Sequence, residues 1–134
     1  MSWPAFGIAT QYKAKPLTDP APARLLALDS GSPRVSVAVG RWGGSIAHRS
    51  TGLATSSGEL LKMAEEALRE VALTPPELDG LIALRGPGSF TGLRVGLATL
   101  LGFHQALGIR ATAFSTLQVL AASVEAPQER VVAL

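Results

Sequence analysis

The chain has 134 residues, 47% of them hydrophobic and 16% charged, which suits one domain with an apolar core and argues against global disorder. The formal net charge is only +2 and the basic residues are scattered, so no clustered footprint indicates direct nucleic-acid binding. Cysteine is absent, which excludes disulfides, thiolate metal sites and a cysteine nucleophile.

The apolar runs are too short for a membrane span, which needs roughly 20 residues. The nearest is 95–109, and His104 and Gln105 interrupt it. The start of the chain lacks the basic-then-apolar order of a secretory signal. We therefore expect a soluble, cytoplasmic protein without a membrane partner. Prolines punctuate residues 1–23, which predicts an irregular N-terminal extension.

Three short strands are predicted after this extension. Residues 25–29 form an apolar run that ends in an acid and a tight turn. Valines alternate with small residues over 35–39, the pattern of a half-buried strand. A third strand is predicted at 45–50, after a turn at two glycines. Tight turns between the three predict an antiparallel meander.

A helix is predicted over 56–72. Ser56 and Glu59 have the spacing of a capping box, and Glu65 and Arg69 form an i,i+4 pair. The sequence 74–76, Thr-Pro-Pro, is expected to end the helix. Its apolar stripe consists of Leu60, Ala64, Ala67, Leu68 and Val71.

The rest of the chain alternates strands with helices. Strands are predicted at 78–84 and 110–114, and helices at 92–107 and 116–124, with Gly108 as the left-handed stop of the first and Ser115 as a cap of the second. A further strand begins at 130–134. Parallel crossovers and an antiparallel meander together predict an α/β fold with a mixed five-stranded sheet and helices on its faces. That is an actin-like (ribonuclease-H-like) lobe over 24–127, with 128–134 starting a second lobe.

The segment Gly86–Arg94, GPGSFTGLR, follows a strand and opens a helix. Free amides at a helix N-terminus favour anions, and an arginine one turn in adds a cation. One interpretation is a phosphate cradle; the other is a tight connection with a good cap. The segment is neither a Walker A loop nor a Rossmann fingerprint. The residues that would face a phosphate here are Gly86, Gly88, Ser89, Thr91 and Arg94.

A second candidate lies at Asp29 and Ser30, where the first strand ends. An acid here either approaches the phosphate end of a nucleotide or bonds the amides of its own turn. Both candidates follow adjacent parallel strands, at the edge where open α/β sheets bind ligands. His48 and His104 have no metal-ligand spacing, so no metal site is predicted, and no Ser-His-Asp set is indicated.

The helix at 92–107 is apolar nearly all round, which predicts cover on both sides. One side is expected to pack on the sheet. The other needs a neighbouring helix, from this chain or a partner. Gly92 and Gly96 would permit close approach by that helix.

Four segments resemble the TsaB (YeaZ) family, paralogous to the TsaD proteins: LALDSG at 26–31, VSVAV at 35–39, GPGSFTGLRVGLATLLGF at 86–103 and STLQVLA at 115–121. The resemblance implies a non-catalytic partner subunit for a TsaD-like catalytic subunit. With a TsaE-like ATPase, the complex forms N6-threonylcarbamoyladenosine at position 37 of tRNA. It also implies that ATP is used by the assembled complex, with no cofactor bound by this chain, and that tRNA is reached only through the complex.

The same resemblance implies that the helices at 56–72 and 92–107 carry the partner interface, and that the chain self-associates through the same surface to a dimer. The interface residues are then Leu60, Ala64, Ala67, Val71, Val95, Gly96, Leu97, Leu100 and Phe103. Ser56 stands where the family often has histidine, which predicts no iron or zinc. The chain stops before the second-lobe motif of the family, which predicts a fragment or truncated product. The alternatives are an actin-like ATPase or phosphotransferase using Asp29 and 86–92, and an M22-type peptidase.

Overall fold

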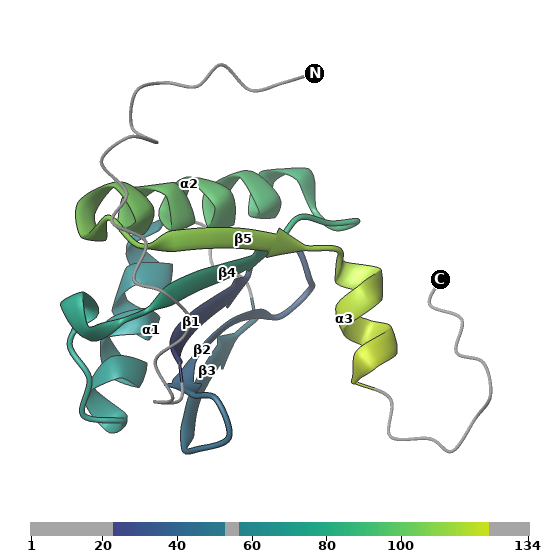
Figure 1. Cartoon of the computed structure of the whole chain (residues 1–134). Helices are drawn as coiled ribbons and strands as arrows, with labels where there is room; N and C mark the ends of the chain where they lie inside the picture. Colours follow the sequence, from purple (N-terminus) through teal and green to yellow (C-terminus); the bar gives the residue numbers. More distant parts are fainter. Residues whose placement is uncertain (1–22, 53–56, 124–134) are drawn as a thin grey trace.

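The computed structural model describes residues 23–52 and 57–123 of the chain. Three sequence predictions lie outside these residues: the extension before residue 23, the cap at Ser56 and the strand at 130–134. The described part folds as one mixed sheet with two long helices against it and a shorter helix after the last strand (Figure 1).

Five strands form the sheet in the spatial order β3-β2-β1-β4-β5. β1, β2 and β3 make an antiparallel meander, whereas β4 pairs parallel with β1 and β5 pairs parallel with β4. The mixed five-stranded sheet predicted from the sequence is therefore confirmed. The strands are β1 (Arg24–Asp29), β2 (Val35–Arg41), β3 (Ile46–Thr51), β4 (Gly80–Leu84) and β5 (Arg110–Phe114).

The helices are α1 (Ser57–Glu70), η2 (Pro75–Glu77, a short 3-10 turn), α2 (Phe90–Leu107) and α3 (Thr116–Ala122). α2 starts two residues before its prediction and ends as predicted, with Gly108 in the left-handed conformation at φ 62°. α1 ends at Glu70, two residues before its predicted end at 72. Ala72 adopts φ 52°, and its amide donates to the carbonyl of Arg69, so the chain leaves the helix before the prolines.

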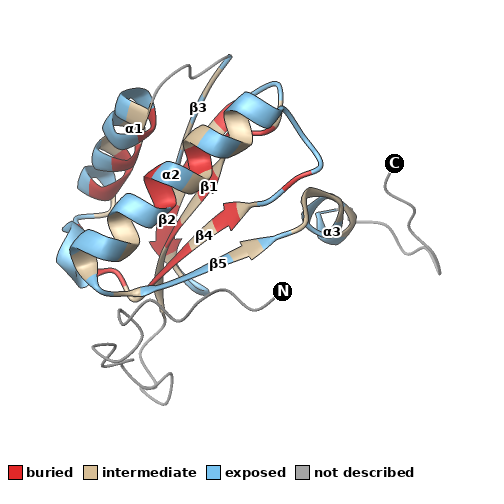
Figure 2. Cartoon of the chain, turned by 90° about the horizontal axis from the view of Figure 1, so that it is seen from above, coloured by how far each residue is buried: buried red, intermediate tan, exposed pale blue. Residues whose placement is uncertain are grey.

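The core lies between the sheet and the pair α1 and α2, which cover the same face (Figure 2). Alternation places the buried side chains of the strands on that face, because successive residues of a strand point to opposite sides. α1 packs over β2 and β3, and α2 over β4, β1 and β5. The buried core residues of the strands are Leu26, Leu28, Val35, Val37, Val39, Ala47, Leu81 and Ala83.

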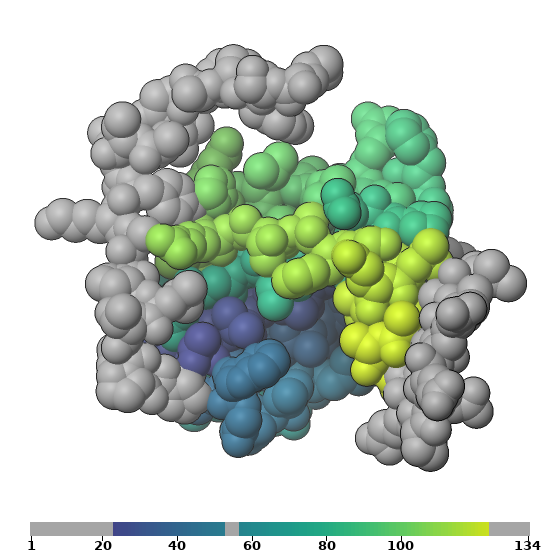
Figure 3. Space-filling model, turned by 45° about the vertical axis from the view of Figure 1, so that its right-hand side comes forward, coloured from purple at the N-terminus to yellow at the C-terminus, as the bar shows by residue number. Residues whose placement is uncertain are grey.

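The far side of the sheet carries the other residues of each strand, which are half-buried or exposed apart from the buried Gly40 and Gly80. Ile46 on β3 and Phe114 on β5 are its exposed large apolar residues. α3 has no buried residue. Figure 3 shows this part of the surface, with β5 and α3 in front and the first three strands below them. Among residues 23–52 and 57–123, no helix combines the length and hydropathy that a membrane crossing requires.

An ion pair ties the beginnings of β1 and β4 together. The guanidinium of Arg24 donates to both carboxylate oxygens of Asp79, at 2.9 and 3.0 Å, and the Arg24 amide donates to Oδ2 at 2.8 Å. The Asp79 amide in turn donates to the carbonyl of Arg24 at 2.8 Å. Because a bidentate arginine–carboxylate pair fixes geometry, the register of the central parallel strands is set at this point.

Candidate functional site

The turn after β1 meets the glycine segment 86–92 at one edge of the sheet. Asp29 accepts hydrogen bonds from the amides of Gly31 and Ser32, at 3.1 and 3.3 Å, and from the hydroxyl of Ser32 at 2.6 Å. The carboxylate therefore performs the turn-forming role that the sequence left open as one interpretation. Whether Asp29 also faces a nucleotide stays a prediction.

The glycine segment makes a sharp bend from β4 into α2. Gly86 has φ 96°, a conformation that an L residue rarely adopts. Ser89 is the N-cap of α2, and its hydroxyl accepts the amide of Gly92 at 3.2 Å. The Ser89 amide donates to the carbonyl of Gly31 at 2.8 Å. Two amides that an anion cradle would offer are thus bonded to the chain itself.

The cation expected at this edge, Arg94, contacts an aromatic ring of its own helix. Arg94 is exposed, and its guanidinium lies 5.5 Å from the ring centre of Phe90, which is 74% exposed. This is a cation–π contact on the surface of the first turns of α2. Gly88 and Thr91 are also exposed. Whether this group faces a phosphate stays a prediction.

The close approach predicted at Gly92 and Gly96 occurs, but its partner is not a helix. A β-carbon built on Gly96 would lie 2.0 Å from the hydroxyl oxygen of Ser30, and one on Gly92 would lie 1.9 Å from the Ser30 carbonyl oxygen. The turn after β1 therefore occupies the space that we had expected another helix to fill. The sequence showed the need for small residues but not the neighbour.

Five of the predicted partner-interface residues are buried within the described part of the chain: Leu60, Ala64, Ala67, Gly96 and Leu100. Their role in partner binding stays a prediction. The other four are half-buried and pack against that core, which leaves part of each side chain toward solvent: Val71, Val95, Leu97 and Phe103. The role of these four in partner binding stays a prediction.

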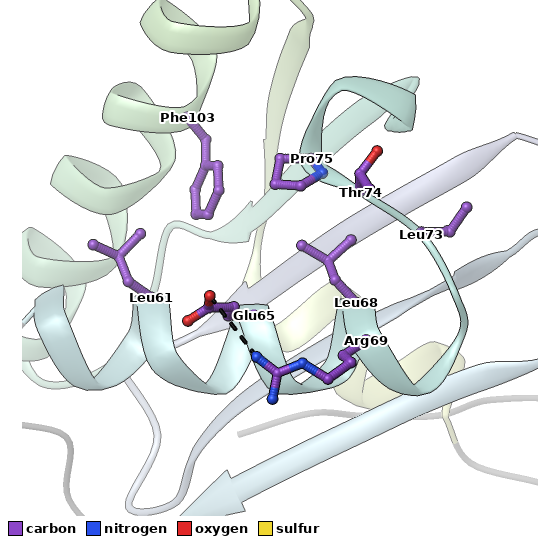
Figure 4. A pocket seen from close by; sticks show the side chains of 8 residues that line it. All are labelled: Leu61, Glu65, Leu68, Arg69, Leu73, Thr74, Pro75 and Phe103. Atoms are coloured by element: carbon purple, nitrogen blue, oxygen red, sulfur yellow. Dashed lines mark ion pairs between the residues drawn. The ribbon is translucent and has the colours of Figure 1, made fainter.

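On each of the two long helices, an exposed leucine directly follows a predicted interface residue: Leu61 follows Leu60, and Leu101 follows Leu100. Leu61 of α1 is 47% exposed and Leu101 of α2 is 53% exposed. A groove of about 490 Å³ lies between α1, the C-terminal half of α2 and η2 (Figure 4). It is lined by Leu61, Glu65, Leu68, Arg69, Leu73, Thr74, Pro75 and Phe103. We call Leu61, Leu97, Leu101 and Phe103, with this groove, the outer helix surface.

Charged groups border the groove. Glu65 and Arg69 pair at 3.9 Å on the exposed side of α1, as predicted from their spacing. At the other border, Glu77 accepts the amide and the hydroxyl of Thr74, at 2.7 and 2.8 Å. The hydrogen bond from the Thr74 amide, followed by that from its hydroxyl, lowers the pKa of Glu77 from its ordinary value of 4.5.

Sequence reasoning missed Leu61 and Leu101 because periodicity identifies an apolar stripe without saying what covers it. Each of the two directly follows a core leucine. The pair of adjacent leucines was the signal in the sequence that one leucine of each pair would be exposed, because adjacent residues of a helix lie on different faces. Of the two histidines, His48 lies on β3, and Nδ1 of His104 lies 2.9 Å from the carbonyl oxygen of Ile109. The prediction that no metal is bound stays a prediction.

Comparisons with known proteins converge on one group. The family model described as "TsaD: tRNA N6-adenosine threonylcarbamoyltransferase" matches residues 54–134. The tRNA threonylcarbamoyladenosine biosynthesis protein TsaB of Escherichia coli is 30% identical over 98 residues, which cover 73% of this chain and 42% of that protein. The TsaB protein of Bacillus subtilis is 29% identical over 100 residues, 74% of this chain and 44% of that protein.

A solved structure agrees with these relatives. YeaZ from Pseudomonas aeruginosa superposes with a TM-score of 0.68 at 31% identity, over 74% of this chain and 46% of that one. The likeness confirms the α/β fold of actin-like, ribonuclease-H-like type. The matched part spans less than half the length of each of these three proteins.

Proposed function

The chain belongs to the TsaB (YeaZ) family, and on that basis we propose that it takes part in the formation of N6-threonylcarbamoyladenosine at position 37 of tRNA. We propose further that it acts as a non-catalytic subunit that supports a TsaD-like catalytic subunit. In this proposal ATP is used by the assembled complex, which includes a TsaE-like ATPase, and tRNA reaches the chain only through the complex.

The observation that supports a partner role is the outer helix surface. Leu61 is 47% exposed and lines a groove whose lining is mostly apolar, and Leu101 is a second large apolar side chain that is half exposed on α2. Exposed apolar surface and apolar grooves mark interaction sites, because leaving them in water is unfavourable. The expected occupant is a helix of the TsaD-like subunit.

The shape of the surface favours a helical occupant. α1, α2 and η2 border the groove, and Leu68 and Phe103 are among the side chains that line it (Figure 4). An amphipathic helix fills such a groove with apolar residues spaced three or four apart. Glu65 and Arg69 at the border can exchange their mutual contact for charges on the arriving helix, which would fix its register.

The contacts of Asp29 support the non-catalytic part of the proposal. A carboxylate has about four acceptor positions, and those used within its own chain are not offered to a ligand. Here one oxygen accepts two backbone amides and the other accepts the Ser32 hydroxyl. The carboxylate is thus engaged in shaping its own turn.

The test is affinity capture of the TsaD-like subunit of the same organism by the full chain. Leu101→Glu and Leu61→Glu are expected to weaken capture by at least about tenfold if these side chains are central anchors. Trp42→Glu is the matched control, since Trp42 is equally apolar and 77% exposed but lies in the turn between β2 and β3. Equal capture by all variants, or no capture by the unaltered chain, would contradict the proposal.

A further inference from the structure

We propose that Ser30, Gly92 and Gly96 form an intramolecular clasp that fixes α2 against the turn after β1. The clasp explains why the segment opening α2 is rich in glycine: these glycines receive the chain's own turn. Resting on the proposed function, we infer in addition that the clasp positions the outer helix surface for its partner.

The first contact of the clasp is between backbones. A β-carbon on Gly92 would lie 1.9 Å from the carbonyl oxygen of Ser30 and 3.0 Å from its carbonyl carbon. No rotation of a side chain can relieve such an overlap, because the obstructing atoms belong to the main chain. The helix can therefore approach the turn this closely only with glycine at position 92.

The second contact lies one helical turn further along. A β-carbon on Gly96 would lie 2.0 Å from the hydroxyl oxygen of Ser30 and 3.2 Å from its β-carbon. Both glycines thus face the same serine. Residues four apart share one face of a helix, so the clasp runs along the inner face of α2.

A hydrogen bond holds the two parts together. The Ser30 side chain donates to the carbonyl of Gly92 at 2.6 Å, and Ser30 is only 6% exposed. Beside it, the amide of Ser89 donates to the carbonyl of Gly31. The turn is therefore joined to α2 by polar contacts at the same place where the glycines allow it to come close.

Gly102 provides the internal contrast. It lies in the same helix, but a β-carbon built there would meet nothing within 4 Å. Glycine is less favourable than alanine inside a helix, and at Gly102 no packing contact offsets that cost. The close contacts at positions 92 and 96 are thus specific to the face that meets the turn.

The clasp has a consequence for the outer helix surface. Leu97 and Leu101 project from the same rigid helix whose inner face is fixed on Ser30. A partner then meets side chains already held in place, and a pre-organised surface loses less entropy on binding. Loosening the clasp should therefore weaken partner binding even in variants that remain folded.

The clasp is tested on the full chain without a partner, by thermal unfolding followed by circular dichroism. Gly96→Ala is expected to lower the midpoint by about 5–10 °C, because the added carbon forces the helix and Ser30 apart. Gly102→Ala, the matched control, should leave the midpoint unchanged or raise it. The decisive variant is Ser30→Ala/Gly96→Ala, which removes the obstructing oxygen and should unfold no lower than Gly96→Ala alone.

Each outcome decides the matter. A midpoint of Gly96→Ala equal to that of the unaltered chain, or a double variant that unfolds at a lower temperature than Gly96→Ala, would overturn the clasp. If Gly96→Ala does not fold, a restored cooperative transition in the double variant supports the clasp, and its absence overturns it.

The inference that the clasp positions the outer helix surface is tested by measuring the affinity for the TsaD-like subunit at a temperature below the thermal midpoint of each variant. Folded Gly96→Ala should bind at least about threefold more weakly, and the double variant should recover; unchanged affinity overturns positioning. If the unaltered chain binds no TsaD-like subunit while the unfolding data follow expectation, the proposed function is wrong and the clasp stands.

Discussion

The two halves of α2 differ in what fixes them. In the N-terminal half, Ser89 caps the helix and Gly92 and Gly96 lie in contact with the turn after β1. In the C-terminal half, Leu101 is half exposed and Gly102 faces open space. The N-terminal half is therefore held by the turn after β1, whereas the C-terminal half has open space beside Gly102 and an exposed leucine next to the buried Leu100. Similar residue types serve opposite purposes a few positions apart.

The largest expected effect on unfolding free energy comes from substituting the adjacent leucines Leu100 and Leu101. Leu100→Glu places a charge in the core, since Leu100 is 4% exposed, and should cost about 4 kcal/mol of unfolding free energy or prevent folding. Leu101→Glu should change the unfolding free energy by no more than about 0.5 kcal/mol. Urea denaturation followed by circular dichroism measures both, and equal losses would remove the distinction between the inner and outer flanks.

The cap at the held end gives an intermediate effect. Ser89→Ala removes the acceptor of the Gly92 amide and should lower the unfolding free energy by about 1 kcal/mol. Ser115→Ala is the control, because Ser115 precedes α3, a helix without buried residues, and fraying there exposes no core. If the two substitutions lower the unfolding free energy equally in the same denaturation assay, the N-cap of α2 contributes no more to stability than that of α3.

The smallest effect concerns the border of the groove, beside the C-terminal half of α2. The pKa of Glu77 is lowered in the folded chain, so its contribution to stability is present above the ordinary value of 4.5 and is lost as pH falls through the lower folded value. Glu77→Gln should slightly flatten the acid side of a plot of thermal midpoint against pH. Thr74→Ala, which removes one donor, should flatten it less, and identical acid slopes for all three chains would contradict the assignment.

Local pattern predicted the elements of this chain well. The alternating valines of β2, the leucines of β1 and the stop at Gly108 were predicted from spacing alone, and the mixed sheet then followed from the meander and the parallel crossovers. These features depend on interactions between residues close in sequence, which the sequence displays directly. α1 ends two residues before its predicted end at 72, because Ala72, an ordinary helix former, takes a left-handed conformation there.

The candidate sites were harder to predict because they depend on distant neighbours. Leu60 and Leu61 are the same residue type side by side, yet only the sheet decides that the first is core and the second is surface. Likewise Gly96 signals a close approach, but Ser30 lies 66 residues before it in the chain and no spacing rule connects them. A stripe of apolar residues predicts which positions of a helix are buried, but it does not predict which other element of the fold buries them.

The ion pair between Arg24 and Asp79 has a consequence for the order of folding. The two residues are 55 positions apart, so bringing β1 beside β4 closes a long loop, whereas the hairpins of β1, β2 and β3 close short ones. Because closing a loop costs more entropy as it lengthens, and distant pairings slow folding, we expect the meander to form early and the β1–β4 seam to be completed late. On this view, neutralising the pair with Asp79→Asn should chiefly accelerate unfolding and leave the refolding rate almost unaltered.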